Sequence, residues 1–274
     1  MNNTNLTIFG VPIHDLGLEG VLAKIKDIVL SNSSGKLIIT ANPEILLEAR
    51  RNKVYKDILQ SAELVVPDGF GVNLAAWFLG RPLKFGRVIG RILAEELVKR
   101  SKDNNYTIFL TGTQNNDILS KAIENLKNES VHYCRSLIVG SHSGPQFFKG
   151  DKYPLNDLEN EKLLDLIKQT KPDILLVGFG HPKQEMWLKH YLPQLPVKVG
   201  IGIGGTLDYW AGLVDKPPIL FSKLGLEWLW RLIKQPKIRF KRVFRAVVLF
   251  PMKVWIDLLK NVFNSLFKQK IDPK

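Results

Sequence analysis

Short apolar runs rich in β-branched residues alternate with segments of helical periodicity along most of this chain. The expected strands span residues 36–40, 63–66, 106–110, 136–140, 173–177 and 197–201. The expected helices span residues 18–31, 44–51, 72–79, 89–101, 116–128, 160–170 and 183–191. Strands that alternate with helices favour parallel pairing. The sequence therefore predicts a Rossmann-like α/β fold, with a mostly parallel sheet flanked by helices, plus a basic helical C-terminal appendage.

Polar and glycine-rich segments follow five of the six expected strands. They span residues 40–44, 67–71, 111–114, 178–185 and 202–208. Each one taken alone is ordinary turn chemistry. Parallel strands of an α/β sheet end at the same edge, however, and ligands bind in the crevice beyond their carboxyl ends. Together the segments predict one crevice lined by hydroxyl, amide, carboxylate and backbone N–H groups.

Composition excludes several classes of protein. The chain has 274 residues, 45% of them hydrophobic, so it has the material for a sizeable core and is not a disordered chain. A single cysteine, Cys134, excludes an intramolecular disulfide and a cysteine-based zinc cluster. We expect no secretory signal, and the longest apolar run near the C-terminus, residues 246–252, is far short of a membrane span. A cytoplasmic location is the expectation.

Positive charge is concentrated near the C-terminus. Of the net charge of +13, residues 223–274 contribute +10 and residues 1–222 only +3. Large apolar residues also recur there at helical spacing: Met252, Trp255, Ile256, Leu259, Phe263, Leu266 and Phe267. A basic amphipathic helix with aromatic residues suits an anionic membrane surface. The pattern also leaves open docking onto the chain's own body or a second subunit, and nucleic-acid binding.

A glycine pattern raises a further alternative. Gly200, Gly202 and Gly205 match G-x-G-x-x-G, the fingerprint of dinucleotide-binding folds. That fingerprint belongs in the first βαβ unit, but here it comes near the end of the sheet. The acidic residue nearest the required offset is Glu227, which stands in an aromatic basic segment. An NAD(P)-dependent oxidoreductase is therefore the weaker alternative. A turn that admits a phosphate or sugar is favoured, and a plain tight turn stays open as well.

Two strand-end segments carry candidate chemistry. Asp68 follows a buried strand and precedes a glycine, as a general base beside a substrate could. Pro182 and the residues after it read as a helix start, where anions are favoured and where Gln184 would face the crevice with its amide. We interpret His181 as a turn residue.

Nothing in the sequence predicts a metal site. The other histidines, His14, His132, His142 and His190, have no metal-ligand spacing. No Asp is followed two residues later by another Asp, the pair with which many sugar-nucleotide transferases hold a divalent ion. Backbone N–H groups, a helix dipole or arginines would then stabilise a leaving diphosphate.

The strand-end motifs together resemble the WecG/TagA/CpsF family of bacterial glycosyltransferases, from about residue 8 to residue 245. The motifs are Thr40-x-Asn42, Pro67-Asp68-Gly69-x-Gly71, Arg87-Val88-x-Gly90, Gly178-x-Gly180-x-Pro182-Lys183-Gln184-Glu185, Gly202-x-Gly204-Gly205-x-x-Asp208-x-x-x-Gly212 and Glu227-Trp228-Leu229-x-Arg231. One motif alone would be weak, but this order and spacing are specific.

The resemblance implies an inverting, metal-independent enzyme without a cofactor. It would transfer a sugar from a UDP-sugar to an undecaprenyl-diphosphate-linked saccharide in cell-surface polysaccharide synthesis. It would act as a peripheral protein at the inner face of the cell membrane, with no nucleic-acid partner, and could form a homo-oligomer. Residues 1–222 would form the catalytic domain and residues 223–274 the membrane-associating segment.

The resemblance also implies the site residues. Asp68 would be the catalytic base. Arg231, Arg239 and Arg242 would close over the diphosphate. The other implied substrate-binding residues are Thr40, Asn42, Arg87, Gln184, Gly204, Gly205 and Asp208.

The chain departs from the family pattern in three places. Gly86 and Arg91 stand where acidic residues are expected, and residues 216–218 read Lys-Pro-Pro where Arg-Ala-Pro is expected. Arg91 in place of an acid points to a different, more anionic donor or acceptor. The donor therefore stays open among N-acetylmannosamine, its uronic acid and glucose.

Overall fold

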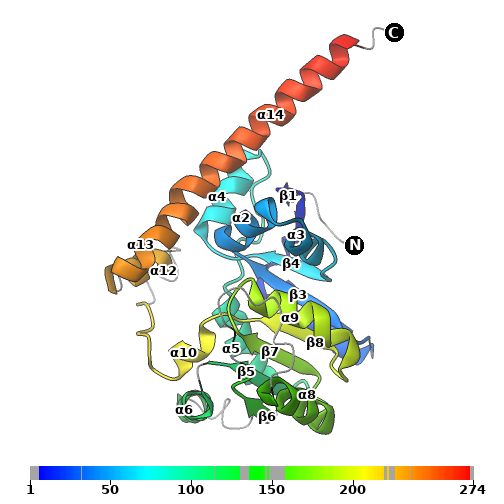
Figure 1. Cartoon of the computed structure of the whole chain (residues 1–274), viewed down its shortest axis with the longest axis vertical. Coiled ribbons are helices and arrows are strands. Elements are labelled where there is room, and N and C mark those ends of the chain that lie inside the picture. The colour runs from blue at the N-terminus through cyan, green and yellow to red at the C-terminus, as the bar shows by residue number, and fades with distance from the viewer. Residues whose placement is uncertain are drawn as a thin grey trace.

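A six-stranded parallel sheet forms the centre of the computed structural model (Figure 1). The strands are β3 (Lys36–Ala41), β4 (Leu64–Pro67), β5 (Ile108–Gly112), β6 (Ile138–His142), β7 (Ile174–Gly178) and β8 (Val199–Gly202), in the order β4-β3-β8-β7-β5-β6. All neighbouring strands pair in parallel. The predicted α/β fold is confirmed, and each of the six expected strands overlaps an observed one.

The structure describes residues 6–31, 33–113, 115–129, 136–145, 147, 158–218, 221, 226–234 and 236–271. Within these ranges, the side chains of residues 231, 238, 239 and 261–271 are not described. The predicted site residues Arg231 and Arg239 therefore have described backbones only. The same holds for Phe263, Leu266 and Phe267 of the predicted amphipathic helix.

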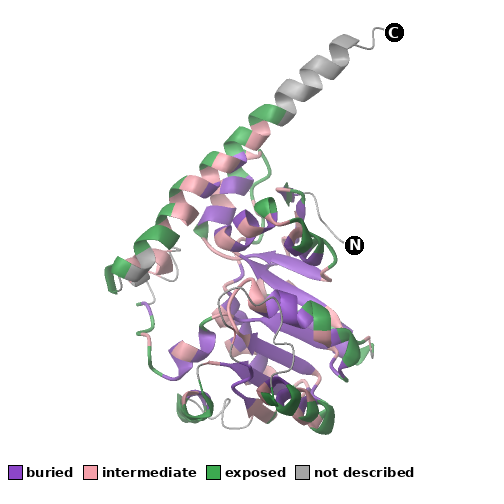
Figure 2. Cartoon of the chain, viewed as in Figure 1, coloured by how far each residue is buried: buried purple, intermediate pink, exposed green. Residues whose placement is uncertain are grey.

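Helices cover both faces of the sheet, so its strands are largely buried, apart from the edge strand β6, where Val139 is exposed (Figure 2). One face packs against α2 (Pro43–Arg51), α3 (Lys53–Gln60), α4 (Phe70–Phe78), α8 (Leu158–Thr170) and α9 (Lys183–Tyr191). The other face packs against α1 (Gly17–Leu30), α5 (Gly90–Arg100), α6 (Asn116–Glu129) and α10 (Thr206–Trp210). Burial on both faces explains why the strands read as continuous apolar runs rather than alternating ones.

The crevice of the sheet is set by the neighbours β3 and β8. The helix after β3, α2, lies on one face, and the helix after β8, α10, lies on the other. Where adjacent strands send their connections to opposite faces, the chain leaves a gap beyond the strand ends. The Thr40 segment and the Gly202 segment therefore border the same crevice.

A two-stranded antiparallel hairpin, absent from the sequence prediction, precedes the sheet. It consists of β1 (Leu6–Ile8) and β2 (Val11–Ile13). His14 joins it to β4, because the Val65 N–H donates a 3.0 Å hydrogen bond to His14 Nδ1. This gives His14 the structural role expected from its sequence context.

The C-terminal helices extend from the body as a long arm (Figure 1). They are α12 (Glu227–Lys234), α13 (Pro236–Phe244), the π-helical η2 (Arg245–Leu249) and α14 (Phe250–Ile271). The short 3-10 helix η1 (Leu192–Gln194) comes earlier in the chain, directly after α9. The apolar periodicity in the sequence begins at Met252, but the helix already includes Phe250 and Pro251. Proline removes one N–H and clashes with the preceding turn, and the π-helical turn of η2 directly before it relieves that conflict. No helix in the described ranges is both long and apolar enough to span a membrane.

Two kinds of contact attach α14 to the body. Phe250 and Val254 are buried, and the Phe250 ring packs edge-on against Phe9 at 5.7 Å. Arg50 of α2 donates two hydrogen bonds to Asp257, of 3.1 and 2.9 Å. The first turns of α14 therefore dock on the chain's own body, which was one of the alternatives left open by the sequence.

The anchoring role of Phe250 predicts a large effect of its truncation. Phe250→Ala should lower the free energy of unfolding by about 3 kcal/mol, because a fully buried ring is lost and a cavity remains. Phe244→Ala, on the half-exposed side of the same arm, should cost less than about 0.5 kcal/mol. Urea denaturation of the two variants measures both values, and equal losses would contradict the assignment of Phe250 as the anchor.

Candidate active site

The end of β3 supplies two of the predicted site residues. The Thr40 side chain is buried and close to Gly90, where an added Cβ would lie 2.8 Å from Thr40 Oγ1. Asn42 caps α2, since its Oδ1 accepts hydrogen bonds from the N–H groups of Glu44, at 3.0 Å, and Ile45, at 3.1 Å. The Asn42 side chain thus closes the helix N-terminus at the mouth of the crevice.

Asp68 lies beside these residues at the end of β4. Its backbone N–H donates a 2.9 Å hydrogen bond to the carbonyl of Ala41, and its side chain is half-buried. Gly69, with φ of +87°, turns the chain directly into α4. The Val88 N–H donates a 2.7 Å bond to the Pro67 carbonyl, which brings the segment of Arg87 next to Asp68. The fold therefore gathers Thr40, Asn42, Asp68 and Arg87 at one corner of the sheet edge.

Gln184 connects two strand-end turns. Its Oε1 accepts hydrogen bonds from the N–H groups of Gly180, at 3.2 Å, and Gly204, at 3.0 Å. Its amide packs so closely on β8 that a Cβ at Gly202 would lie 2.4 Å from Nε2. We expected the Gln184 amide to face the crevice and bind substrate there. Its described hydrogen bonds instead connect the two turns that border the crevice. Its role in substrate binding stays a prediction.

A buried acid lies next to this amide. Glu185 is 1% exposed and accepts hydrogen bonds from Gln184 Nε2, at 2.7 Å, and from the Tyr55 hydroxyl, at 3.0 Å. Burial raises the pKa of the Glu185 carboxyl and also the pKa of the Tyr55 hydroxyl. Sequence reasoning missed this network, because Tyr55 lies on α3, a helix that was not predicted.

The turn after β8 holds the remaining predicted residues. Gly204 has a φ of +52°, and Gly205 is the N-cap of α10. Asp208 is half-buried in the first turn of α10, and its Oδ2 would lie 3.4 Å from a Cβ at Gly205. These residues line the β8 side of the crevice, next to Gln184.

The C-terminal arm reaches the crevice through Arg242. Its Nε donates a 2.7 Å hydrogen bond to Glu44 Oε2, and a second guanidinium nitrogen bonds to the same oxygen. Glu44 is two residues from Asn42, so the guanidinium lies at the β3 corner. The pKa of His181 is lowered, mainly by burial of its ring. The negative charge of Glu44 acts to raise this pKa, and the positive charge of Arg242 acts to lower it. His181 stands in the turn before α9, as interpreted from the sequence, and the charges at the β3 corner act on its ring.

Two of the three departures from the family pattern, Arg91 and Gly86, have local structural explanations. Arg91 donates to both oxygens of Glu95, at 2.8 and 3.0 Å, and to Glu227 of α12, at 3.4 Å. Arg91 thus joins α5 to the C-terminal arm, and its suggested link to a different donor or acceptor stays a prediction. Gly86 has a φ of +76°, a conformation that favours glycine over an acidic residue.

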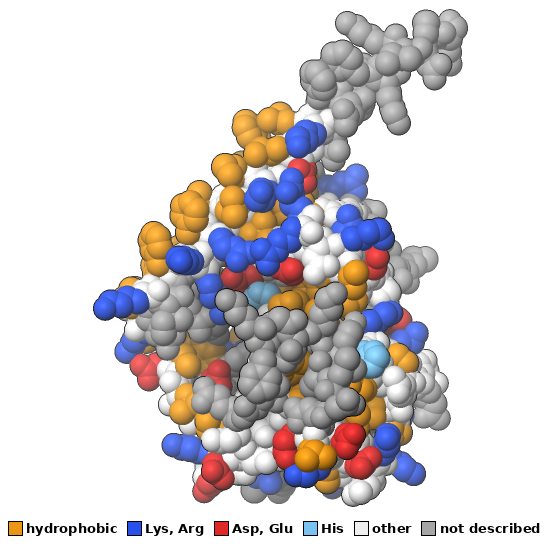
Figure 3. Space-filling model, viewed as in Figure 1, with side chains coloured by type: hydrophobic (Ala, Val, Ile, Leu, Met, Phe, Trp, Pro, Cys, Tyr) orange, Lys and Arg blue, Asp and Glu red, His pale blue; other side chains and the backbone are white. Residues whose placement is uncertain are grey.

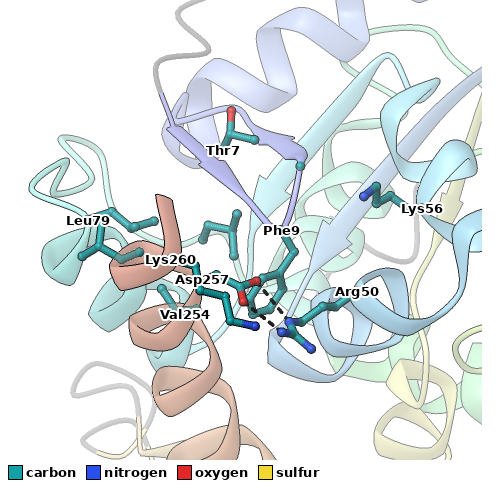
Figure 4. A pocket seen from close by; sticks show the side chains of 11 residues that line it. Thr7, Phe9, Arg50, Lys56, Leu79, Val254, Asp257 and Lys260 are labelled. Atoms are coloured by element: carbon teal, nitrogen blue, oxygen red, sulfur yellow. Dashed lines mark hydrogen bonds and ion pairs between the residues drawn. The ribbon is translucent and has the colours of Figure 1, made fainter. Parts of the chain in front are cut away.

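A cavity lies elsewhere on the molecule, and no predicted site residue lines it. It has a volume of about 740 Å³ between the β1–β2 hairpin, α2, α3 and α14 (Figure 4). Buried Thr111 Oγ1, near the end of β5, is one of four buried side-chain polar atoms in the described residues that have no hydrogen-bond partner. Among the described residues, no three His, Cys, Asp or Glu side chains cluster as metal ligands would.

Comparison with known proteins gives consistent results. The family model described as "Glycosyl transferase WecG/TagA/CpsF family" matches residues 6–263. A Staphylococcus aureus protein (strain NCTC 8325 / PS 47) is 31% identical over 256 residues, which are 92% of this chain and 93% of that protein. A Bacillus spizizenii protein is 29% identical over 229 residues, 84% and 82% of the two chains. Both relatives are named N-acetylglucosaminyldiphosphoundecaprenol N-acetyl-beta-D-mannosaminyltransferase.

The buried Glu185 predicts a pH-dependent effect of its replacement. Because burial raises its pKa above the unfolded-state value, its contribution to stability is full below the unfolded pKa of about 4.3 and is lost as pH rises through the folded pKa. Gln has no such loss. The free energy of unfolding of Glu185→Gln, relative to the unaltered chain, should therefore increase with pH above about 4.3. Urea denaturation from pH 5 to pH 8 measures this, and a pH-independent difference would contradict it.

Proposed function

This chain belongs to the glycosyl transferase WecG/TagA/CpsF family, and we propose that it transfers N-acetylmannosamine from a UDP-sugar to N-acetylglucosamine carried on undecaprenyl diphosphate. The observation that carries the proposal is the match of nearly the whole chain to relatives whose names state this transfer. Its glycosyltransferase class follows from the family. The donor, the acceptor and the stereochemical course are the proposed parts.

Asp68 is the proposed catalytic base. Its carboxylate takes the proton of the acceptor hydroxyl while that oxygen forms a bond to the anomeric carbon of the donor. The bond between the anomeric carbon and the β-phosphate oxygen breaks, and its electron pair leaves with UDP. One such in-line displacement inverts the anomeric configuration. The half-buried position of Asp68 at a strand end, in contact with the β3 backbone, supports this role.

Arginines are the proposed partners of the leaving diphosphate. Arg242 supports this part, because its guanidinium lies at the β3 corner of the crevice, held by Glu44. A guanidinium matches two phosphate oxygens at once and keeps its charge. Arg231 and Arg239 stand on α12 and α13 of the same arm. Together they would stabilise the charge that develops on UDP, without a metal ion.

The arm also supports peripheral attachment to the inner face of the membrane. Seven exposed apolar side chains of α13, η2 and α14 recur at helical spacing and are here called the C-terminal stripe: Phe240, Phe244, Val248, Met252, Trp255, Ile256 and Leu259. Figure 3 shows hydrophobic side chains along one edge of the arm and Lys and Arg on the neighbouring face. This arrangement suits an anionic bilayer. It favours a membrane over nucleic acid, which would use the charges and leave the stripe exposed to water.

Replacement of the proposed base gives the first functional prediction. Asp68→Asn should lower kcat by about 10²- to 10⁴-fold, because the amide cannot accept the proton. Asp165→Asn, an exposed aspartate on α8, is the matched control and should keep full activity. Transfer is measured by mass spectrometry with the cognate donor, and full activity of Asp68→Asn would remove the base assignment.

A donor panel tests the reaction itself. Purified protein receives UDP-N-acetylmannosamine, its uronic acid, UDP-N-acetylglucosamine or UDP-glucose, with synthetic lipid-diphosphate-N-acetylglucosamine as acceptor. We expect transfer from UDP-N-acetylmannosamine, undiminished by EDTA, with the product in the β configuration. Transfer from a different donor would refute the sugar assignment, and loss of transfer in EDTA would refute metal independence.

A further inference from the structure

The outward face of helix α4 is apolar, although it lies on the protein surface. Residues 69–80 contain no charged side chain, and Asn73 is their only polar one. Gly71, Val72, Ala75 and Ala76 face the core. On the outward face, Phe70 is 43%, Trp77 65% and Phe78 38% exposed. A surface helix normally carries polar residues there, and one that is apolar all round is covered by something.

The body of the protein places α4 against the C-terminal arm. A Cβ at Gly71 would lie 3.1 Å from the carbonyl oxygen of Ala246 and 3.6 Å from the Phe250 ring. Figure 4 shows Leu79, just after α4, and Arg50 of α2 on opposite sides of the α14 residues between them. Helix α4 and helix α2 therefore flank α14 on different edges.

The edge of α14 on the side of α4 is the apolar one. An α-helix has 3.6 residues per turn, so residues can be ordered by their angle around the axis of α14. From the body outward on one side, that order is Val254, Leu258, Trp255 and Leu259. On the other side, next to Asp257 and its partner Arg50, come Lys253 and Lys260. The exposed aromatic face of α4 thus continues the C-terminal stripe.

Charge decides which partner covers this combined surface. Arg81 and Lys84, both exposed, follow α4, and residues 223–274 carry a net charge of +10. Two copies of a chain with a net charge of +13 would repel each other at such a surface. An anionic bilayer attracts the cations and accepts Trp and Phe at its interface.

We propose that α4 is a second membrane-contacting element, which inserts its outward aromatic face beside the C-terminal stripe into an anionic phospholipid surface. The inference rests on the proposed function, since it takes the acceptor to be lipid-linked. Asp68 directly precedes Gly69, the N-cap of α4. Contact of α4 with the bilayer therefore sets the proposed base at the depth of the lipid headgroups, where the acceptor diphosphate lies.

Vesicle binding by the full chain tests the proposal. Trp77→Ser/Phe78→Ser should weaken binding to phosphatidylglycerol-containing vesicles by about tenfold or more, since two large aromatic side chains lose their apolar contact. Trp77→Phe should keep most of the vesicle binding that the single variant Trp77→Ser loses. The matched control is Leu30→Ser/Val54→Ser, two side chains 67% and 58% exposed on α1 and α3, which should bind like the unaltered chain. Circular dichroism verifies that each variant is folded.

The outcomes separate this proposal from the proposed function. Unchanged vesicle binding of folded Trp77→Ser/Phe78→Ser overturns the role of α4, as does an equal loss in the Leu30→Ser/Val54→Ser control. A change from dimer to monomer in sedimentation, with vesicle binding intact, assigns the face to a second copy and also overturns it. Absence of sugar transfer by the unaltered chain refutes the proposed function, while the vesicle measurement still decides whether α4 contacts lipid. If the proposal is correct, Trp77→Ser/Phe78→Ser also has a higher KM for acceptor carried in vesicles.

Discussion

Close packing of α9 on β8 is the constraint on which the crevice depends. Gly200 and Gly202 lie in β8, where a Cβ at position 200 would lie 2.7 Å from Leu188 and one at position 202 would lie 2.4 Å from Gln184. Only glycine lets α9 approach the strand this closely. The approach allows one amide, that of Gln184, to bond to the turns after β7 and β8 at once. These glycines were a weak match to a dinucleotide fingerprint, and their positions inside a strand give them a packing role.

The buried network behind Gln184 extends that constraint to the other side of the crevice. Glu185 bonds to Tyr55 of α3, which follows α2 and its cap residue Asn42. A buried carboxyl with two donors is costly to disturb, because a donor left without a partner loses its solvation. The network therefore holds the β3 and β8 sides of the crevice in a fixed relation. Rigid walls of this kind are what a site needs to position a sugar donor.

The sheet and its strand-end motifs could be predicted because their signals are local. Apolar runs such as residues 173–177 read as buried strands, and Asp68 follows its strand within two residues. Features that depend on distant partners could not be predicted. The five-residue helix α10 is too short for a periodic signal, and the Arg91 contact with Glu227 spans 136 positions. The continuous helix through Pro251 was missed because a proline normally ends a helix, and the π-helical turn that accommodates it has no simple sequence signature.

The arm that carries the C-terminal stripe also brings Arg242 to the crevice, so the proposed membrane contact and the proposed diphosphate partner lie on the same element. Among the described residues, four ion pairs tie the arm to the body: Arg242 with Glu44, Arg50 with Asp257, Arg91 with Glu227 and Lys234 with Asp215. Partly exposed pairs contribute only about 0–1 kcal/mol each, less than the burial of one aromatic ring. The buried side chains of Phe250 and Val254 therefore fix where the arm docks, while the ion pairs adjust its orientation. Glu44 holds Arg242 by an ion pair with two hydrogen bonds. Under the proposed function, the diphosphate would compete with that carboxylate for the guanidinium, while Phe250 and Val254 keep the arm docked.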